Sequence, residues 1–360
     1  MNYHLVLTRR CNLNCTYCHG GEETGPATEV QYELDDLAAF LQQDSNVQLM
    51  FYGGEPTLRI SLLTEIMDRV PSARFMLQTN ALLLNRIPAK YLHQFHSILV
   101  SIDGRETVTD GYRSAGVYRR VLENVHWLYE QNFQGDIVAR MAISEQSDIY
   151  QEVRHLLELP NPRFHHVHWQ LNVVWDAEGN WRDFDDWVET SYNPGIRRLV
   201  SEWVARMHEG VVEGIVPFLP VMHDLLTGQS SSIRCGAGCD TFAIHVDGSI
   251  GICPISPDWP FSIVGDIWRT KPANLENVMQ VEEPCPSCED YGLCGGRCLF
   301  ANRKRLWGET GFVKVCATVK HLLACLRDQV PEIKKLLAQG TIALDDFAYP
   351  EFNNGCEIIP

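Results

Sequence analysis

The chain has 360 residues, of which 45% are hydrophobic and 21% are charged, and its formal net charge is −16. This length exceeds the size at which a single core stops growing, so two structural units are expected. The negative charge opposes phosphate backbones and anionic membranes, so neither a nucleic acid nor a membrane is expected as a partner. No stretch is long enough for a membrane span or suited to a signal peptide, which predicts a cytoplasmic protein.

Strand-like and helix-like stretches alternate over the first 175 residues. Continuous apolar strands separated by helices are typical of a parallel sheet covered by helices, so we predict an α/β fold curled into a partial (β/α)6 barrel. Such sheets carry their chemistry at the carboxyl ends of the strands. The expected strands are 4–8, 47–54, 74–80, 97–104, 136–144 and 165–175, and the expected helices are 30–43, 58–70, 88–95, 118–131 and 149–159.

The composition changes after residue 175. Residues 176–195 are acidic and rich in tryptophan, a helix is expected around 196–209, and residues 226–234 have the composition of a linker. We therefore expect a first unit at 1–230 with a helical connector at 176–230, a cysteine-rich unit at 231–330 and a C-terminal tail at 331–360.

Thirteen cysteines are segregated along the chain. In a reducing cytoplasm they are expected to be thiols, available as metal ligands rather than joined in disulfides. Cys11, Cys15 and Cys18 are spaced C-x3-C-x2-C directly after the first expected strand. Three thiolates are one fewer than a structural zinc site requires, so the fourth ligand comes either from elsewhere in the chain or from a non-protein group.

Eight more cysteines lie between residues 235 and 316. They could hold two zinc ions, but a partnering second C-x2-C of the zinc-ribbon type is absent, and eight thiolates equally suit two four-thiolate iron–sulfur clusters. They are Cys235, Cys239, Cys253, Cys285, Cys288, Cys294, Cys298 and Cys316.

Several of these stretches resemble known motifs. CNLNCTYC, at residues 11–18, resembles the signature of the radical S-adenosylmethionine (radical SAM) superfamily, and the second cysteine block resembles the SPASM extension of peptide-modifying members. FYGGEPTL, QTNALLL and SIDGRETVTDGYR are similar to internal motifs of the superfamily and follow in the expected order. The resemblance extends over residues 4–320 and includes the anaerobic sulfatase-maturing enzymes.

The resemblance implies three [4Fe–4S] clusters and S-adenosylmethionine (SAM) as cofactors. The three loop cysteines would hold three irons of the first cluster and leave the fourth iron for SAM. An electron, delivered by a flavodoxin or ferredoxin type of donor, would then break the sulfonium bond and yield a 5′-deoxyadenosyl radical. The family's interleaved pairing would give one auxiliary cluster Cys235, Cys239, Cys253 and Cys298, and the other Cys285, Cys288, Cys294 and Cys316. With all eight ligands present, electron transfer is favoured over direct ligation of substrate.

The resemblance also implies residues that contact SAM. Tyr17 is expected beside the adenine, although packing of the loop is an alternative role. Gly53, Gly54 and Glu55 match the segment that receives the methionine amino group, because glycines allow close backbone approach and a carboxylate pairs with an ammonium. An ordinary turn at the end of a strand is the alternative role of the two glycines.

Four further positions are expected near SAM. Ser101 and Arg113 match positions that contact SAM in the sulfatase-maturing enzymes, where a hydroxyl and a guanidinium suit its ribose and carboxylate. Arg140 is a second candidate for the carboxylate, with a solvated surface arginine as the alternative. Leu171 could line the adenine or be plain core.

Some features depart from the sulfatase-maturing pattern or lack a role. Those enzymes carry an aspartate as catalytic base after the third cysteine of the second block, whereas this chain has Pro254, and Asp258 is only a candidate substitute. We therefore assign no catalytic base. Ten residues precede the first cysteine, so no leader-peptide-binding domain is expected before it. Cys325 is expected to be a buried small hydrophobe, and Cys356 has no expected role.

We predict a radical SAM/SPASM oxidoreductase that abstracts hydrogen from a peptide or protein substrate and removes a second electron through its auxiliary clusters. The product would be a crosslink, a thioether or a dehydrogenated residue. The enzyme alternatives are a formylglycine-generating sulfatase activator and a small-molecule dehydrogenase. A zinc or iron–sulfur scaffold or sensor would explain the cysteines, but not the Gly-Gly-Glu-Pro and Ser-Ile-Asp-Gly segments at the ends of strands.

Overall fold

The computed structural model describes residues 1–360 except 19–27, 173–182, 257–258, 306 and 351–358. The strands of the described residues form one sheet in the order β6-β5-β4-β3-β2-β1-β7-β8-β9. These strands are β1 (Asn2–Val6), β2 (Gln48–Tyr52), β3 (Arg74–Thr79), β4 (Phe95–Ser101), β5 (Asp136–Ile143), β6 (His166–Leu171), β7 (Thr241–Ile244), β8 (Ser249–Gly251) and β9 (Ile263–Asp266).

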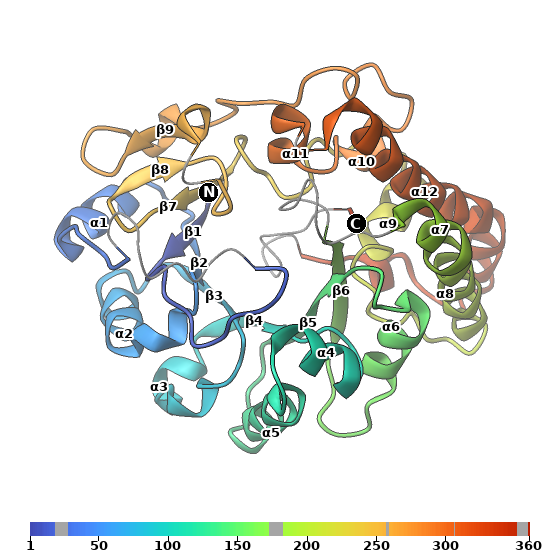
Figure 1. Ribbon diagram of the computed structural model, residues 1–360, viewed down its shortest axis with the longest axis horizontal. Helices are drawn as coiled ribbons and strands as arrows, with labels where there is room; N and C mark the ends of the chain where they lie inside the picture. Colours follow the sequence, from blue (N-terminus) through green and yellow to red (C-terminus); the bar gives the residue numbers. More distant parts are fainter. Residues whose placement is uncertain (19–27, 173–182, 257–258, 306, 351–358) are drawn as a thin grey trace.

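The first six strands are all parallel, which confirms the predicted α/β fold and its six strands with shifts of a few residues at their ends. The crossover helices lie on the outer side of the curved sheet (Figure 1). They are α1 (Leu34–Leu41), α2 (Ile60–Arg69), α3 (Ala89–Leu92), α5 (Val117–Glu130) and α6 (Ile149–Glu158). One further helix, α4 (Glu106–Arg113), follows β4 and was not predicted from the sequence.

The strands are continuously apolar because both faces of the sheet are covered. In the core, the ring of Phe51 stacks on Phe75 with 5.9 Å between centroids and meets Phe95 edge-on at 6.1 Å. These aromatic contacts join three neighbouring strands, and they bury the large apolar areas that stabilise the sheet.

The cysteine-rich region continues the same sheet. Strand β7 pairs in parallel with β1, and β8 and β9 follow as antiparallel strands. Between β6 and β7 lie α7 (Phe184–Trp187), α8 (Asn193–Met207) and α9 (Leu219–Thr227), and α9 occupies the start of the expected linker. After β9 come α10 (Tyr291–Cys294), α11 (Leu299–Lys304) and α12 (Gly308–Gln339). Helix α12 packs against α8 and α9 and continues past residue 331, where a tail was expected.

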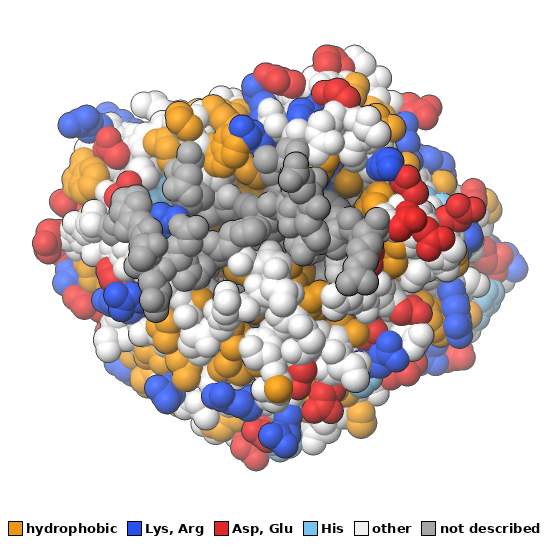
Figure 2. Space-filling model, viewed as in Figure 1, with side chains coloured by type: hydrophobic (Ala, Val, Ile, Leu, Met, Phe, Trp, Pro, Cys, Tyr) orange, Lys and Arg blue, Asp and Glu red, His pale blue; other side chains and the backbone are white. Residues whose placement is uncertain are grey.

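Acidic and basic side chains are interspersed on the face shown in Figure 2, and acidic side chains gather on its right-hand side, over α7. Of the helices that the structure describes, none combines the length and the apolar character needed to cross a bilayer.

Candidate functional site

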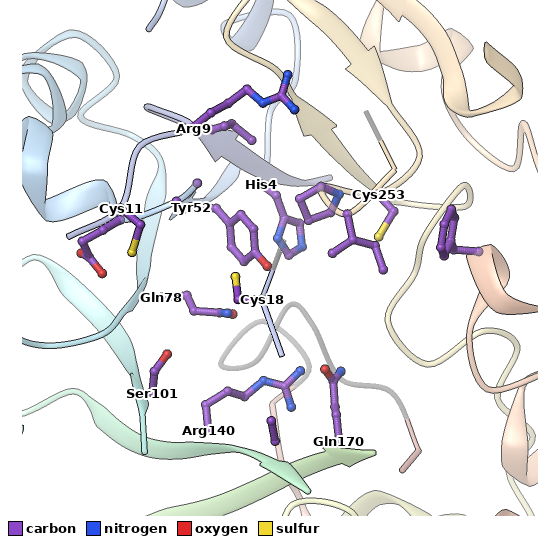
Figure 3. Close-up of a pocket in the computed structure, with 18 of the residues that line it drawn as sticks. His4, Arg9, Cys11, Cys18, Tyr52, Gln78, Ser101, Arg140, Gln170 and Cys253 are labelled. Carbon is purple, nitrogen blue, oxygen red and sulfur yellow. The ribbon is translucent and has the colours of Figure 1, made fainter. Parts of the chain in front are cut away.

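A cavity of about 930 Å³ lies at the carboxyl ends of the parallel strands (Figure 3). It is lined by all the residues that the sequence places near SAM, by the three loop cysteines, and by three cysteines of the C-terminal block. These residues are Tyr17, Gly53, Gly54, Glu55, Ser101, Arg113, Arg140 and Leu171, with Cys11, Cys15 and Cys18, and with Cys235, Cys253 and Cys298.

The cysteine loop is tied to the strand ends around it. The Cys11 thiol accepts a hydrogen bond from the backbone N–H of Leu13 at 3.4 Å, and the Asn80 amide lies 3.8 Å from the same sulfur. Burial raises the pKa of Cys11 and raises that of Cys15 to about 11. In Figure 3, Cys11 and Cys18 are drawn in the space between the strand ends. Thiols with raised pKa values become thiolate ligands when a metal supplies positive charge.

Among the described residues, no group of three His, Cys, Asp or Glu side chains is arranged to hold a metal ion. The thiolates of a cubane cluster each bind a different iron, so they stand further apart than the ligands of a single ion. None of the twelve described cysteines is joined in a disulfide.

The two glycines of the Gly-Gly-Glu segment bring the end of β2 against the chain that enters the cysteine loop. A Cβ at Gly53, where φ is +143°, would lie 2.3 Å from the Thr8 carbonyl oxygen, and a Cβ at Gly54 would lie 2.2 Å from that of Arg10. The backbone N–H of Gly54 donates to the Thr8 carbonyl at 2.8 Å. The close approach at these glycines is thus to the protein backbone, and their contact with SAM stays a prediction.

Glu55 is 1% exposed, and its hydrogen bonds link the segments at the ends of β2 and β3. Its carboxylate accepts hydrogen bonds from the backbone N–H of Thr57 at 2.9 Å, the Thr57 hydroxyl at 2.5 Å, the Thr79 hydroxyl at 2.7 Å and the backbone N–H of Asn80 at 2.7 Å. Burial raises the pKa of this carboxyl, while the hydrogen bonds oppose the rise. The carboxylate therefore has a structural role besides its predicted contact with an ammonium.

A buried ion pair joins β4 to α4. The Arg113 guanidinium donates to Asp103 through Nε at 2.6 Å and Nη2 at 3.0 Å. The same carboxylate accepts the Tyr17 hydroxyl at 3.0 Å and the backbone N–H of Ala142 at 2.9 Å. Burial acts to lower the pKa of Arg113, but the Asp103 charge outweighs it and the net shift is upward. The Arg113 guanidinium, which was predicted to bind the SAM carboxylate, thus binds the Asp103 carboxylate. Asp103 lies in the SIDGRETVTDGYR motif but was not predicted as a site residue.

Tyr17 is held on several sides. Its ring meets that of Tyr112 edge-on at 5.3 Å, and the Arg113 guanidinium carbon lies 5.5 Å from its centroid. Burial raises the pKa of its hydroxyl. These contacts fix the cysteine loop against α4, so the packing role is present, and a contact with adenine stays a prediction.

Arg140 is the cation that projects into the cavity from β5, opposite Ser101 in the strand register. It is 6% exposed, so its alternative role as a solvated surface arginine is wrong. Its Nη1 lies 2.6 Å from Nδ1 of His168 on β6. Leu171, at the end of β6, is 2% exposed and also lines the cavity, so it belongs to both the core and the site.

The C-terminal cysteines lie close to one another. Cys235, Cys239, Cys253 and Cys285 pack against one apolar cluster, and Cys235 also packs against the small cluster that contains Cys298. Burial raises the pKa of Cys294 to about 12, and the charges of Cys285 and Cys316 add to this shift. The thiols of Cys285, Cys288, Cys294 and Cys316 interact electrostatically. The division of the eight cysteines into two interleaved sets stays a prediction.

Three other expectations concern this region. Cys325, on α12, is half-buried rather than buried, and its sulfur lies 3.5 Å from Nε2 of His321. Pro254 lines the cavity next to Cys253. Asp258 and Cys356 lie outside the described residues.

Sequence comparisons identify relatives of the chain. The radical SAM superfamily model matches residues 5–174. Fe-coproporphyrin III synthase of Methanosarcina barkeri is 29% identical over 81% of each chain. The cysteine-type anaerobic sulfatase-maturating enzyme of Clostridium novyi is 22% identical over 80% of this chain and 84% of its own. An uncharacterized protein of Methanocaldococcus jannaschii is 31% identical, but this chain covers only 39% of its length.

Solved structures share the fold. The structure of anSMEcpe with bound AdoMet has a TM-score of 0.74 at 17% identity and covers 93% of this chain and 99% of its own. Streptococcus suis SuiB bound to S-adenosylmethionine has a TM-score of 0.57 at 14% identity and covers 83% of this chain and 73% of its own. Since most of the chain is covered, the shared fold extends well beyond residue 174. The chain carries a radical SAM domain at residues 5–174.

Proposed function

We propose that this chain is a SPASM-type oxidoreductase that oxidises a peptide or protein substrate by two electrons. One observation carries the proposal: the same cavity is lined by the three loop cysteines and by Cys235, Cys253 and Cys298. A substrate in this cavity would be near both groups of cysteines. Hydrogen abstraction beside one group and electron removal toward the other are therefore compatible with a single binding position.

The donor set supports three [4Fe–4S] clusters. Three cysteines at the cavity would leave one iron without a protein ligand, and eight further cysteines in the C-terminal region are the number that two four-thiolate clusters need. When bound, the loop cluster and SAM supply a 5′-deoxyadenosyl radical. We propose Cys11, Cys15 and Cys18 for the first cluster and the two interleaved sets of four for the others.

We propose Arg140 rather than Arg113 for the SAM carboxylate. The Arg113 guanidinium faces the Asp103 carboxylate, whose negative charge would repel the SAM carboxylate, whereas Arg140 projects into the cavity beside Ser101 and contacts the imidazole of His168. Glu55 and the adjoining glycines support the amino group, while Tyr17 and Leu171 bound the adenine side.

The proposed division of the chain keeps a first unit at 1–230, a SPASM unit at 231–330 and the remaining residues as an extension. The pairing of β7 with β1 makes the first two units share one sheet. We propose a cytoplasmic enzyme, since eleven thiols in ligand positions suit a reducing compartment, with a flavodoxin or ferredoxin type of electron donor.

A peptide substrate is supported by what the structural neighbours bind. SuiB is known in a structure with its precursor peptide SuiA, and anSMEcpe is known with the Kp18Cys peptide. The formylglycine reaction is disfavoured, because Pro254 carries no titratable group beside Cys253 to deprotonate a substrate thiol or hydroxyl.

A small-molecule substrate is the second candidate. The relative that is matched over 81% of both chains is named Fe-coproporphyrin III synthase. A cavity of about 930 Å³ also lies within the range of small-molecule sites, which is roughly 300–1,000 Å³.

The deciding experiment uses anaerobically reconstituted protein, a reductant and SAM, with peptides encoded near the gene in one arm and tetrapyrroles in the other. A cognate peptide should give one 5′-deoxyadenosine per turnover and a product lighter by two hydrogens. Deuterium at the attacked carbon should appear in the deoxyadenosine. Turnover of a tetrapyrrole alone supports the second candidate, formylglycine production supports a sulfatase activator, and a product of unchanged mass indicates an epimerase.

A further inference from the structure

Arg297 is a buried cation with no hydrogen-bond partner among the described residues. Its side chain follows the turn after α10 and is only 6% exposed. Its Nε, Nη1 and Nη2 atoms are all buried, and none has a hydrogen-bond partner among the residues that the structure describes. An arginine carries five N–H donors and stays protonated in proteins, so burying it with no acceptor carries a large energetic penalty.

Two other arginines with buried side chains show what is missing. Arg113 donates twice to Asp103. Arg234 donates to Asp224 at 2.7 Å and to the Leu293 carbonyl at 2.7 Å. Each of these side chains has an acceptor within the protein, and Arg297 therefore requires an acceptor of another kind.

The surroundings of Arg297 indicate which acceptor this is. Its electrostatic neighbours are Cys298, Cys294, Tyr192 and Cys316. Cys298 belongs to the first proposed set of four cysteines, whereas Cys294 and Cys316 belong to the second. The Tyr192 hydroxyl accepts a hydrogen bond from Nε1 of Trp169 at 3.1 Å. The guanidinium is thus within electrostatic reach of cysteines from both proposed sets, and it directly precedes Cys298 in the chain.

We propose that Arg297 binds both auxiliary clusters at once, donating hydrogen bonds to sulfur atoms of each and raising the reduction potential of both. A cubane cluster with four thiolates carries a net negative charge, which grows by one when the cluster is reduced. A fixed cation beside it therefore favours the reduced state, and hydrogen bonds to the sulfurs act in the same direction. The inference rests on the two auxiliary clusters proposed above and is independent of the substrate.

The test uses protein in which Cys11, Cys15 and Cys18 are replaced by alanine, so that only the auxiliary clusters remain. Arg297→Gln in this background removes the charge and most of the donors. The midpoint potentials of both clusters are followed by electron paramagnetic resonance during a redox titration. Both potentials should fall by at least about 59 mV, which corresponds to a tenfold change in the equilibrium constant for reduction. Arg297→Lys, which keeps the charge and loses the fork, should give a smaller fall.

Arg303→Gln is the matched control, because Arg303 lies on α11 nearby but pairs with Glu282 at the surface. It should leave both potentials unchanged. If Arg297→Gln binds about eight irons and both midpoint potentials are unchanged, the inference is wrong. If the midpoint potential of only one cluster falls, Arg297 does not contact both clusters. A background protein that binds no iron would refute the auxiliary clusters themselves, and the inference with them.

If Arg297→Gln does not retain its iron, a second experiment tests the proposal. It uses the background protein labelled with ¹⁵N-arginine and the Arg297→Lys variant of that labelled protein. Pulsed electron paramagnetic resonance should detect ¹⁵N coupling at both reduced clusters, and this coupling should be lost in Arg297→Lys. Absence of coupling at either cluster in the labelled background protein contradicts the proposal, whether or not the variants retain iron.

Discussion

The two cysteine regions differ in how their polar groups are satisfied. Around the cysteine loop, Glu55 accepts four hydrogen bonds and Asp103 is engaged by Arg113, Tyr17 and Ala142. In the C-terminal region, all three side-chain nitrogens of Arg297 lack a partner among the described residues. The buried polar groups around the loop therefore have protein partners, whereas Arg297 has none among the described residues and is expected to find its acceptors in the proposed clusters.

Removing the iron should give the largest difference between the two regions, which is a difference in protease sensitivity. After chelation, limited proteolysis should cleave first between residues 282 and 307, because the helices in this segment, α10 and α11, are short and four of the proposed cluster ligands lie within it. The sheet from β1 to β6 should stay resistant. Mass spectrometry of the fragments identifies the sites, and first cleavage within the sheet would contradict the comparison.

Removing the cysteine ligands of one cluster at a time tests the same difference between the loop and the C-terminal region. Replacing Cys11, Cys15 and Cys18 with alanine should lower the iron content from about twelve to about eight per chain and abolish SAM cleavage. Replacing Cys285, Cys288, Cys294 and Cys316 should also remove about four irons, but only this variant should gain the protease sensitivity of the cluster-free protein. Equal sensitivity of the two variants would show that the loop also depends on its cluster for order.

Breaking the buried ion pair tests the protein contacts at the loop. Asp103→Asn leaves the Arg113 guanidinium buried without its counter-ion, which should cost about 3–5 kcal/mol in the free energy of unfolding. Urea unfolding of cluster-free protein measures this loss. The control is Asp35→Asn, which removes an exposed ion pair with Arg69 and should change the stability by about 0.5 kcal/mol or less.

Arg140 is expected to contribute to ligand binding rather than to iron binding. Arg140→Gln should weaken SAM binding by about 1.5–3 kcal/mol, as expected for hydrogen bonds to a charged group, with the iron content unchanged. Anaerobic titration calorimetry measures the affinity. Ser101→Ala, which removes a neutral hydroxyl, should weaken SAM binding by only about 1 kcal/mol. An unaltered SAM affinity in the Arg140 variant would indicate that Arg113, and not Arg140, binds the SAM carboxylate.

The smallest effect concerns the sheet far from the cysteines. Burial acts to raise the pKa of Asp136, but hydrogen bonds from His165 and His166 outweigh it and hold the pKa at about 2. Because the folded pKa lies below the unfolded value of about 3.9, this carboxylate stabilises the fold above pH 4. About 2 kcal/mol should be lost as the pH falls toward 2. Acid unfolding of cluster-free Asp136→Asn should lack this loss.

The sheet and the ligands could be predicted because local patterns encode them. Apolar runs mark buried parallel strands, and cysteine spacing marks the ligand sets. Helix α4 escaped prediction since its buried residues include Thr109 and Arg113, which interrupt the apolar periodicity. The partners of Asp103 and the isolation of Arg297 depend on contacts between distant segments, such as Tyr17 with Asp103, so no local pattern reveals them.

The pairing of β7 with β1 has a consequence for dissecting the chain. Strand β1 is flanked by β2 on one side and by β7 on the other. If the chain were cut at residue 230, the apolar strand leading into the cysteine loop would become a bare edge with unpaired backbone groups, which templates association with other chains. The radical SAM portion alone should therefore self-associate, and the C-terminal region acts as a cap on that edge as well as a carrier of ligands.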